Sequence, residues 1–358
     1  MASRTLISSI GLEIEFAGIP KNYGELLRRE TTWRLVEDGS CRSRRNVIPG
    51  IPIETRGGSE RTMFGGEFVS PVIDTETNEV WKEELVTILE WLASSGEGLD
   101  VKTAIHVHVN VEGIPLFAIQ NLLRLGLFIE AGIYRLACAE MGVHRGSLHL
   151  DYGYCRPISE MGPPVVVCND EVYRPIFDTN RLLSVTSLSQ LRQALGRYDR
   201  HGGSKYHEAR YVWLNLISMY QLGSVEFRLF NSTYSYRNVL SWVDLCQHFV
   251  RASFTAPAEL PVNPLGSDTL QLEDIVNVLN IRDGKTLYTL ENLWNSTEYQ
   301  RGVRGYQMGH LEHMTNWGRS LKAIRPEPID PSQIHSFHEF SLGNNPQPVV
   351  NGWYTLRS

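Results

Sequence analysis

Three short segments of this chain alternate between apolar residues and acidic, imidazole or guanidinium residues, strictly so in 105–111, and a fourth segment, 66–70, carries a single Glu. Such alternation has the period of two that marks a β-strand whose two faces meet different surroundings. The polar members are Glu13 and Glu15 in 9–16, Glu67 in 66–70, His106 and His108 in 105–111, and Glu226 and Arg228 in 225–230. Leu, Ile, Val and Phe dominate the opposite positions. We therefore expect a mainly antiparallel sheet with one apolar face and one polar face.

The rest of the chain shows helical periodicity between the strands. Helices are predicted at 21–30, 79–94, 115–140, 187–195 and 237–254, with helical pieces at 270–279, 287–294 and 297–321. Loops rich in Arg, Gly or Pro are predicted at 42–61 and 141–180. These elements predict an α+β fold with helices packed on the apolar face of a curved sheet. We expect a domain at 1–260 and a helical or irregular extension at 261–358 that packs on it.

Two further strands are predicted at 33–37 and 210–217. By alternation, Tyr211, Trp213 and Asn215 are expected on one face of the second of these strands. The same alternation places Phe230 on the polar face of the strand at 225–230.

Composition and charge narrow the classes of protein to which the chain can belong. It has 358 residues, of which 42% are hydrophobic, so it can bury a sizeable core without metals or disulfides. The net charge of −6 gives no general attraction to nucleic-acid backbones or anionic membranes. The most apolar stretch, 115–139, is interrupted by Arg124, Glu130 and Arg135, which favours a buried helix over a membrane span. Five dispersed cysteines and the lack of a signal-peptide core at the N-terminus favour a cytoplasmic protein with reduced thiols.

The polar faces of the four strands would bring four carboxylates and two imidazoles together if the strands are neighbours. Such carboxylates repel one another and raise one another's pKa values, and a divalent cation relieves this repulsion. Carboxylates with one or two imidazoles suit a hard cation, Mg²⁺ or Mn²⁺, better than a closed zinc site. Mg²⁺ held by few carboxylates commonly bridges nucleotide phosphates, and Arg228 shares a face with Glu226. These residues therefore favour phosphoryl chemistry.

Seven segments of the chain share their order and spacing with a known family. They are GLEIEF (11–16), W-x4-DGS (33–40), GGEFVSP (65–71), HVHV (106–109), YCRP (154–157), RYVWLNL (210–216) and VEFRLFNST (225–233). As a set they resemble the amidoligase family, a branch of the glutamine synthetase and glutamate–cysteine ligase superfamily of carboxylate–amine ligases. The resemblance implies a glutamine-synthetase-like catalytic domain. Such a domain uses ATP and Mg²⁺ or Mn²⁺ to join a carboxylate to an amine through an acyl phosphate.

The resemblance also implies roles for individual residues. The implied metal ligands are Glu13, Glu15, Glu67, His106 and Glu226, and His108 would contact the nucleotide. Arg228 would contact the transferred phosphate, and Asp38, in the DGS turn, would accept a proton from the attacking amine. Arg156, Arg210 and Asn215 would contact the acid substrate or the phosphates. The chain departs from glutamine synthetases at Ser224, where those enzymes have a nucleotide-binding arginine.

Other interpretations of the same residues stay open. DGS is a common turn sequence, Arg156 and Arg210 can hold loops, and Asn215 can end a strand. The chain could instead be a phosphotransferase of the guanidino-kinase type, or a non-catalytic relative that binds a metal or a peptide. The acid and the amine could be small molecules, peptides or a modified nucleobase. The acidic charge balance does not favour a role on nucleic acid, but the sequence leaves one open. The sequence does not define the oligomeric state.

Overall fold

The computed structural model describes residues 7–20, 29–37, 41, 63–94, 103–138, 155, 158, 166–168, 171–173, 179–196, 210, 212–257, 260 and 270–295. The predicted loop at 42–61 and the predicted helix at 297–321 lie outside these residues, as do most of the stretches 21–30 and 141–180.

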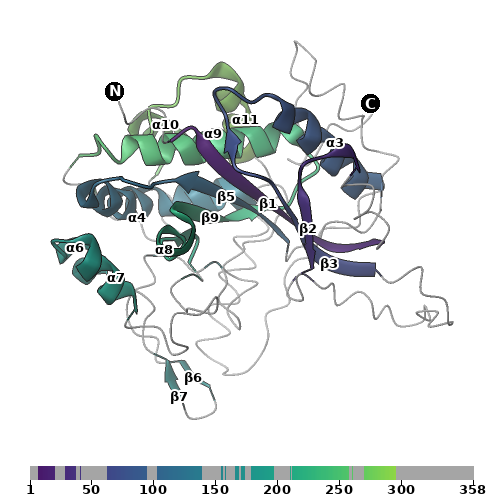
Figure 1. Cartoon of the computed structure of the whole chain (residues 1–358). Coiled ribbons are helices and arrows are strands. Elements are labelled where there is room, and N and C mark those ends of the chain that lie inside the picture. Colours follow the sequence, from purple (N-terminus) through teal and green to yellow (C-terminus); the bar gives the residue numbers. More distant parts are fainter. Residues whose placement is uncertain are drawn as a thin grey trace.

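One antiparallel sheet forms the centre of the fold (Figure 1). Its strands run in the order β2 (Arg34–Glu37), β3 (Met63–Val69), β1 (Ser9–Pro20), β5 (Ala104–Asn110), β9 (Ser224–Asn231) and β8 (Leu214–Asn215). The short β4 (Ile73–Asp74) pairs with the beginning of β1. The four strands with polar alternation, β3, β1, β5 and β9, are direct neighbours. The predicted antiparallel sheet is therefore confirmed. A separate hairpin joins β6 (Val166–Cys168) to β7 (Glu171–Tyr173).

Helices pack against this sheet, as the α+β class requires. α9 (Tyr236–Ala252) contacts β5, α4 (Leu116–Cys138) contacts β9, and α3 (Val80–Ser94) packs beside α9. Figure 1 shows α3, α9, α10 (Leu272–Val278) and α11 (Gly284–Trp294) on one side of the sheet. The shorter α6 (Thr179–Ser184) packs on α4, α7 (Leu188–Gly196) packs on α6, and α8 (Ser218–Leu222) packs on β9. The predicted helices in the described residues agree with these bounds to within a few positions.

α4 is the core helix predicted from the apolar stretch at 115–139. Its length and composition would also suit a membrane span, but 72% of its most apolar window is buried inside the fold. At its last turn, Arg135 lies over the ring of Trp294 in α11, with its guanidinium carbon 4.1 Å from the ring centroid. The Nε of Arg135 also donates to the carbonyl oxygen of Trp294 at 2.8 Å. The prediction of a buried helix is confirmed.

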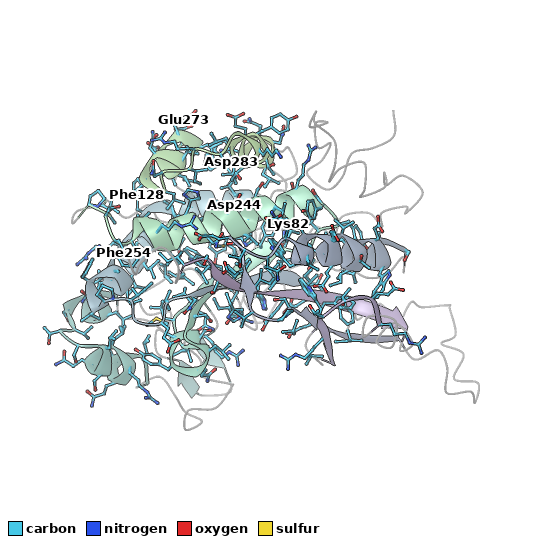
Figure 2. All side chains as sticks on the ribbon, turned by 45° about the horizontal axis from the view of Figure 1, so that its top comes forward. Lys82, Phe128, Asp244, Phe254, Glu273 and Asp283 are labelled. Carbon is cyan, nitrogen blue, oxygen red and sulfur yellow. The ribbon has the colours of Figure 1, made fainter. Side chains whose placement is uncertain are left out.

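The described part of the predicted extension packs on the rest of the fold. α11 contacts both α9 and α4, and α10 contacts α4. At the start of α11, the hydroxyl of Thr286 donates to Oδ2 of Asp244 in α9 at 2.8 Å. Figure 2 shows Asp283, the N-cap of α11, above Asp244. The division of the chain at residue 260 stays a prediction.

A β-bulge interrupts the pairing of β5 with β9. Val107 pairs with Phe227 but Ile105 pairs with Phe230, so β9 has one residue more than β5 in this interval. As a result, Phe230 turns to the apolar face, where its ring stacks on Trp242 of α9 with the centroids 4.5 Å apart. The prediction that Phe230 lies on the polar face is therefore wrong. The extra residue of the bulge reverses the faces of the residues that follow it, and alternation in the sequence does not reveal such an insertion.

The strand predicted at 210–217 is much shorter than its alternation suggested. Among the described residues 210 and 212–217, only Leu214–Asn215 forms a strand, and the chain then turns into α8. The ring of Trp213 packs on Phe249 of α9 with the centroids 6.0 Å apart, whereas Asn215 reaches Glu226 on the polar face. The prediction that Trp213 and Asn215 share a face is therefore wrong, because two paired residues do not maintain the alternation of a long strand.

Candidate active site

Three cross-strand pairs assemble the polar face of the sheet. Glu13 of β1 lies opposite His106 of β5, and Glu15 of β1 lies opposite Glu67 of β3. His108 of β5 lies opposite Glu226 of β9. Residues directly opposite one another on an antiparallel pair have Cβ atoms about 4.5–5.5 Å apart. The register therefore places six predicted site residues within reach of one another, although they come from four separate parts of the chain.

His106 occupies the centre of this face. Its Nδ1 lies 3.1 Å from Oε2 of Glu13 and 3.5 Å from Oε1 of Glu226. Its Nε2 lies 3.5 Å from Oε1 of Glu15. Glu13, His106 and Glu226 each present one ligand atom, and these three atoms lie within 4.8 Å of one another. The arrangement is a compact group of two carboxylates and one imidazole, in which both His106 and Glu226 are buried.

His108 is held by two hydroxyl groups that the sequence did not identify as partners. Its Nδ1 lies 3.0 Å from Oγ of Ser224 and 3.3 Å from Oγ of Ser218, and these two oxygens are 3.0 Å apart. Its Nε2 faces the site, 3.5 Å from Oε1 of Glu13. The hydroxyl of Ser224 thus helps to orient the imidazole of His108. The only sequence signal was that Ser224 precedes Glu226 by two positions on the same strand.

Glu226 is also bound by residues of its own edge of the sheet. Nη1 of Arg228 forms an ion pair with Oε1 of Glu226. The side-chain amide of Asn215 donates to Oε2 of Glu226 at 2.5 Å, while Oδ1 of Asn215 accepts from the backbone N–H of Ile217 at 2.9 Å. Both ends of the Asn215 amide are thus engaged, so this residue fixes the orientation of Glu226.

Burial and neighbouring charges shift the pKa values of the cluster. Burial acts to raise the pKa of Glu13, but the neighbouring imidazoles of His106 and His108 outweigh it and hold that pKa well below the ordinary carboxyl value. Burial likewise acts to raise the pKa of Glu226, yet the Arg228 guanidinium and the two imidazoles lower it. The pKa of His108 is raised, because Glu13 and Glu226 outweigh the burial that would lower it. Both carboxylates are therefore ionised near neutral pH.

A second group of possible ligands lies on the β1–β3 side of the face. Glu15, Cys41 and Glu67 each present one ligand atom, and these atoms also lie within 4.8 Å of one another. Oε2 of Glu15 additionally accepts from the backbone N–H of Ala104 at 2.7 Å. Cys41 is buried, and sequence reasoning did not place it at the site. The one available signal was its position directly after the DGS segment.

The donor atoms of Glu13, His106 and Glu226 fit a divalent cation, since carboxylate oxygens with a single imidazole suit Mn²⁺ or Mg²⁺. In the second group, the carboxylates of Glu15 and Glu67 suit the same cations, whereas the thiol of Cys41 is a soft ligand that does not. In addition, Nε2 of His108 is buried without a hydrogen-bond partner among the described residues, although buried polar atoms normally have one. A ligand atom bound at the site would satisfy it.

The remaining predicted site residues lie at or beyond the edge of the described structure. Asp38 and Arg156 are outside the described residues. Arg210 is half-buried in the segment that leads to β8. The roles assigned to these three residues stay predictions, as does the contact with the acid substrate or the phosphates that was predicted for Asn215.

Comparison with known proteins gives a family match over most of the chain. A family model described as "Putative amidoligase enzyme" matches residues 7–250. Among solved structures, a bifunctional glutathione synthetase from Pasteurella multocida is similar at a TM-score of 0.40 and 12% identity, over 86% of this chain and 49% of that chain. This chain thus spans about half the length of that protein, and the likeness is too low to support an argument about function. No curated protein matches the chain. Because the family match includes every strand of the polar face and most of the 358 residues, this chain belongs to the amidoligase family.

Proposed function

We propose that this protein is an ATP- and Mg²⁺-dependent ligase that joins a carboxylate to an amine through an acyl phosphate. The main support is the proximity of two kinds of group on one buried face. A cluster of carboxylates and an imidazole can bind a cation, and it lies in direct contact with the guanidinium of Arg228. Cations and a guanidinium that converge on one point are the groups that phosphoryl transfer requires.

The two ligand groups would hold the cations. Glu13, His106 and Glu226 would bind one, and Glu15 with Glu67 would bind another, with the thiol of Cys41 beside them. Bound there, Mg²⁺ or Mn²⁺ would neutralise negative charge on the nucleotide phosphates.

In the first step, an oxygen of the substrate carboxylate attacks the γ-phosphorus of ATP. The bond from that phosphorus to the bridging oxygen breaks, which yields an acyl phosphate and ADP. Arg228 is the group placed to stabilise charge on the transferring phosphoryl, since its ion pair with Glu226 fixes its orientation. His108, oriented by Ser218 and Ser224, presents Nε2 to the nucleotide.

In the second step, the amine nitrogen attacks the carbonyl carbon of the acyl phosphate. The carbon–oxygen bond to phosphate breaks, inorganic phosphate leaves, and the proton of the amine passes to Asp38. Arg156 and Arg210 are the proposed contacts to the acid substrate or the phosphates. An acyl phosphate hydrolyses readily, so the burial of His106 and Glu226 favours the reaction by limiting access of water.

The experiment is a screen of acid and amine pairs with ATP and Mg²⁺, in which phosphate release and the mass of the product are both measured. The proposal predicts an amide product, and a loss of turnover of about 10²–10³-fold in Arg228→Ala. Arg282→Ala, on an exposed arginine after α10, is the matched control. Full turnover in Arg228→Ala would overturn the proposal. A stable phosphorylated product without an amide would indicate a phosphotransferase, and metal binding without nucleotide binding would indicate a non-catalytic relative.

A further inference from the structure

Glu130 is a fully buried carboxylate in the middle of the apolar helix α4, with no exposed surface. Burying a polar or charged group costs free energy unless it receives hydrogen bonds. Its Oε1 accepts from Nε1 of Trp213 at 2.7 Å and from the backbone N–H of Ile158 at 2.5 Å. A single oxygen thus joins two segments that are far apart in the sequence.

Two neighbours of Glu130 on α4 contact the same two segments. Gly126, Glu130 and Tyr134 are spaced four residues apart, so they lie along one face of the helix. The hydroxyl of Tyr134 donates to the carbonyl oxygen of Cys155 at 2.5 Å. A Cβ on Gly126 would lie 2.7 Å from Cδ1 of Ile158, so glycine is what permits this close approach.

Both segments bind the backbone of Arg228. The N–H of Arg228 donates to the carbonyl oxygen of Trp213 at 2.9 Å. The carbonyl oxygen of Arg228 accepts from Sγ of Cys155 at 3.2 Å. Arg228 lies in the β-bulge of β9, where pairing with β5 is interrupted. These two contacts therefore hold the peptide groups of Arg228 where the regular ladder does not.

We propose that Glu130 and Tyr134 are positioning residues, which act from the core helix through Trp213 and Cys155 to fix the backbone of Arg228. This inference rests on the proposed function, in which Arg228 contacts the transferred phosphoryl. Neither residue touches the substrate. Their effect is to keep the guanidinium in the orientation that catalysis needs, because small displacements of a catalytic group cost much of its rate effect.

The experiment compares Tyr134→Phe and Glu130→Met with Glu130→Gln in the full chain. Glu130→Gln is the conservative variant, since its amide oxygen can still accept both hydrogen bonds. The first readout is the rate at which a thiol reagent alkylates Cys155, resolved by mass spectrometry. Cys246, fully buried in α9, is the internal reference. We expect Tyr134→Phe and Glu130→Met to raise the alkylation rate of Cys155 at least about fivefold over that of Cys246, as local release of a segment does. Glu130→Gln is expected to keep the alkylation rate of Cys155 at the wild-type value.

The second readout is steady-state kinetics with the acid and amine pair found by the screen. Tyr134→Phe and Glu130→Met are expected to lower kcat roughly five- to tenfold, about what the loss of one buried hydrogen bond would cause, with KM for the acid little changed. Ser253→Ala loses a buried hydrogen bond to the carbonyl oxygen of Val250 at the end of α9, and is the matched control with unchanged kcat.

The two readouts separate this inference from the proposed function. A wild-type protein without ligase turnover would refute the proposed function, while the alkylation of Cys155 would still decide whether α4 holds this segment. Unchanged alkylation of Cys155, or an equal rise at Cys155 and Cys246, would overturn the inference. A raised alkylation rate of Cys155 together with a wild-type kcat in Tyr134→Phe and Glu130→Met would also overturn the inference.

Discussion

The carboxylate of Glu226 lies between an arginine, an asparagine and a histidine, and these contacts determine what it can do. Oε2 accepts a hydrogen bond from the amide of Asn215, so the carboxylate cannot rotate freely. Oε1 contacts Arg228 and lies 3.5 Å from Nδ1 of His106. One oxygen therefore orients the group and the other serves the site. A carboxylate fixed in this way is pre-organised for ligation, as outer partners of metal ligands commonly ensure.

Replacing Glu226 by Gln is therefore expected to weaken cation binding. The amide removes one negative charge from the group formed with Glu13 and His106, and it keeps the size of the side chain. We expect the affinity of the full chain for Mn²⁺ to fall roughly 10–100-fold or more, measured by titration calorimetry. Glu273→Gln, on an exposed position of α10, should bind Mn²⁺ as the wild type does. An unchanged affinity in Glu226→Gln would exclude this carboxylate as a ligand.

The lowered pKa of Glu13 makes a prediction about stability in acid. A carboxyl group whose pKa is lower in the folded state stabilises the fold above its ordinary pKa, and this contribution is lost as the pH falls through the lowered value. In Glu13→Gln, the free energy of unfolding should therefore depend less steeply on pH below about 4.5. Urea unfolding at a series of acidic pH values, without added metal, measures this slope. If the free energy of unfolding depended on pH as steeply in Glu13→Gln as in the wild type, the prediction would be contradicted.

At the scale of elements, the bulge in β9 changes which residues of the strand face the site and which face the core, relative to strict alternation. Upstream of the bulge, Glu226 faces the site and Phe227 faces the core. Downstream of it, Phe230 also faces the core and stacks on Trp242. The inserted residue therefore lets one strand supply Arg228 to the site and two aromatic rings to the packing beneath α9.

Phe230→Ala tests this placement. Removing a fully buried aromatic ring from a core typically costs about 3–5 kcal/mol of unfolding free energy. We expect a loss in that range from urea unfolding of the full chain. Phe117→Ala is the matched control, because Phe117 is 52% exposed and its loss should cost less than about 1 kcal/mol. A Phe230→Ala variant as stable as the control would place this ring on the polar face after all.

The parts of the fold and the site that could be predicted were the strands in which apolar and polar residues alternate with a period of two. The strands with Glu13, His106 and Glu226 alternate over several residues, so their polar faces could be read from the sequence, and β-sheet pairing then placed them together. The bulge could not be predicted, because an insertion in one strand is defined only against its partner. Cys41 and Ser218 were missed for a similar reason. They enter the site from outside the four alternating strands, and no periodicity fixes where such segments meet the sheet.

At the scale of the whole molecule, α4 connects the candidate site to the C-terminal helices. The face with Gly126, Glu130 and Tyr134 meets the segments that hold Arg228. Gly132 lies on another face of α4, next to α10 and the residues before it. A Cβ on Gly132 would lie 2.4 Å from Cδ1 of Ile275 and 2.9 Å from Cδ2 of Leu270. Glycine in mid-helix costs up to about 1 kcal/mol relative to alanine, so its presence here is explained by this close packing.

Gly132→Leu therefore tests whether the residues after 260 are part of the same folded body. Because the added side chain has no space beside Ile275, we expect the free energy of unfolding to fall by roughly 1–3 kcal/mol, through overpacking between α4 and α10. Gly284→Leu is the matched control, since a Cβ at Gly284 meets no atom within 4 Å, and its effect should stay within about 0.5 kcal/mol. If α10 instead belonged to an independent unit, Gly132→Leu would be no more costly than Gly284→Leu. Hydrogen exchange of α4 and α10, compared in the two variants, locates the effect: protection should fall in both helices of Gly132→Leu and in neither helix of the control.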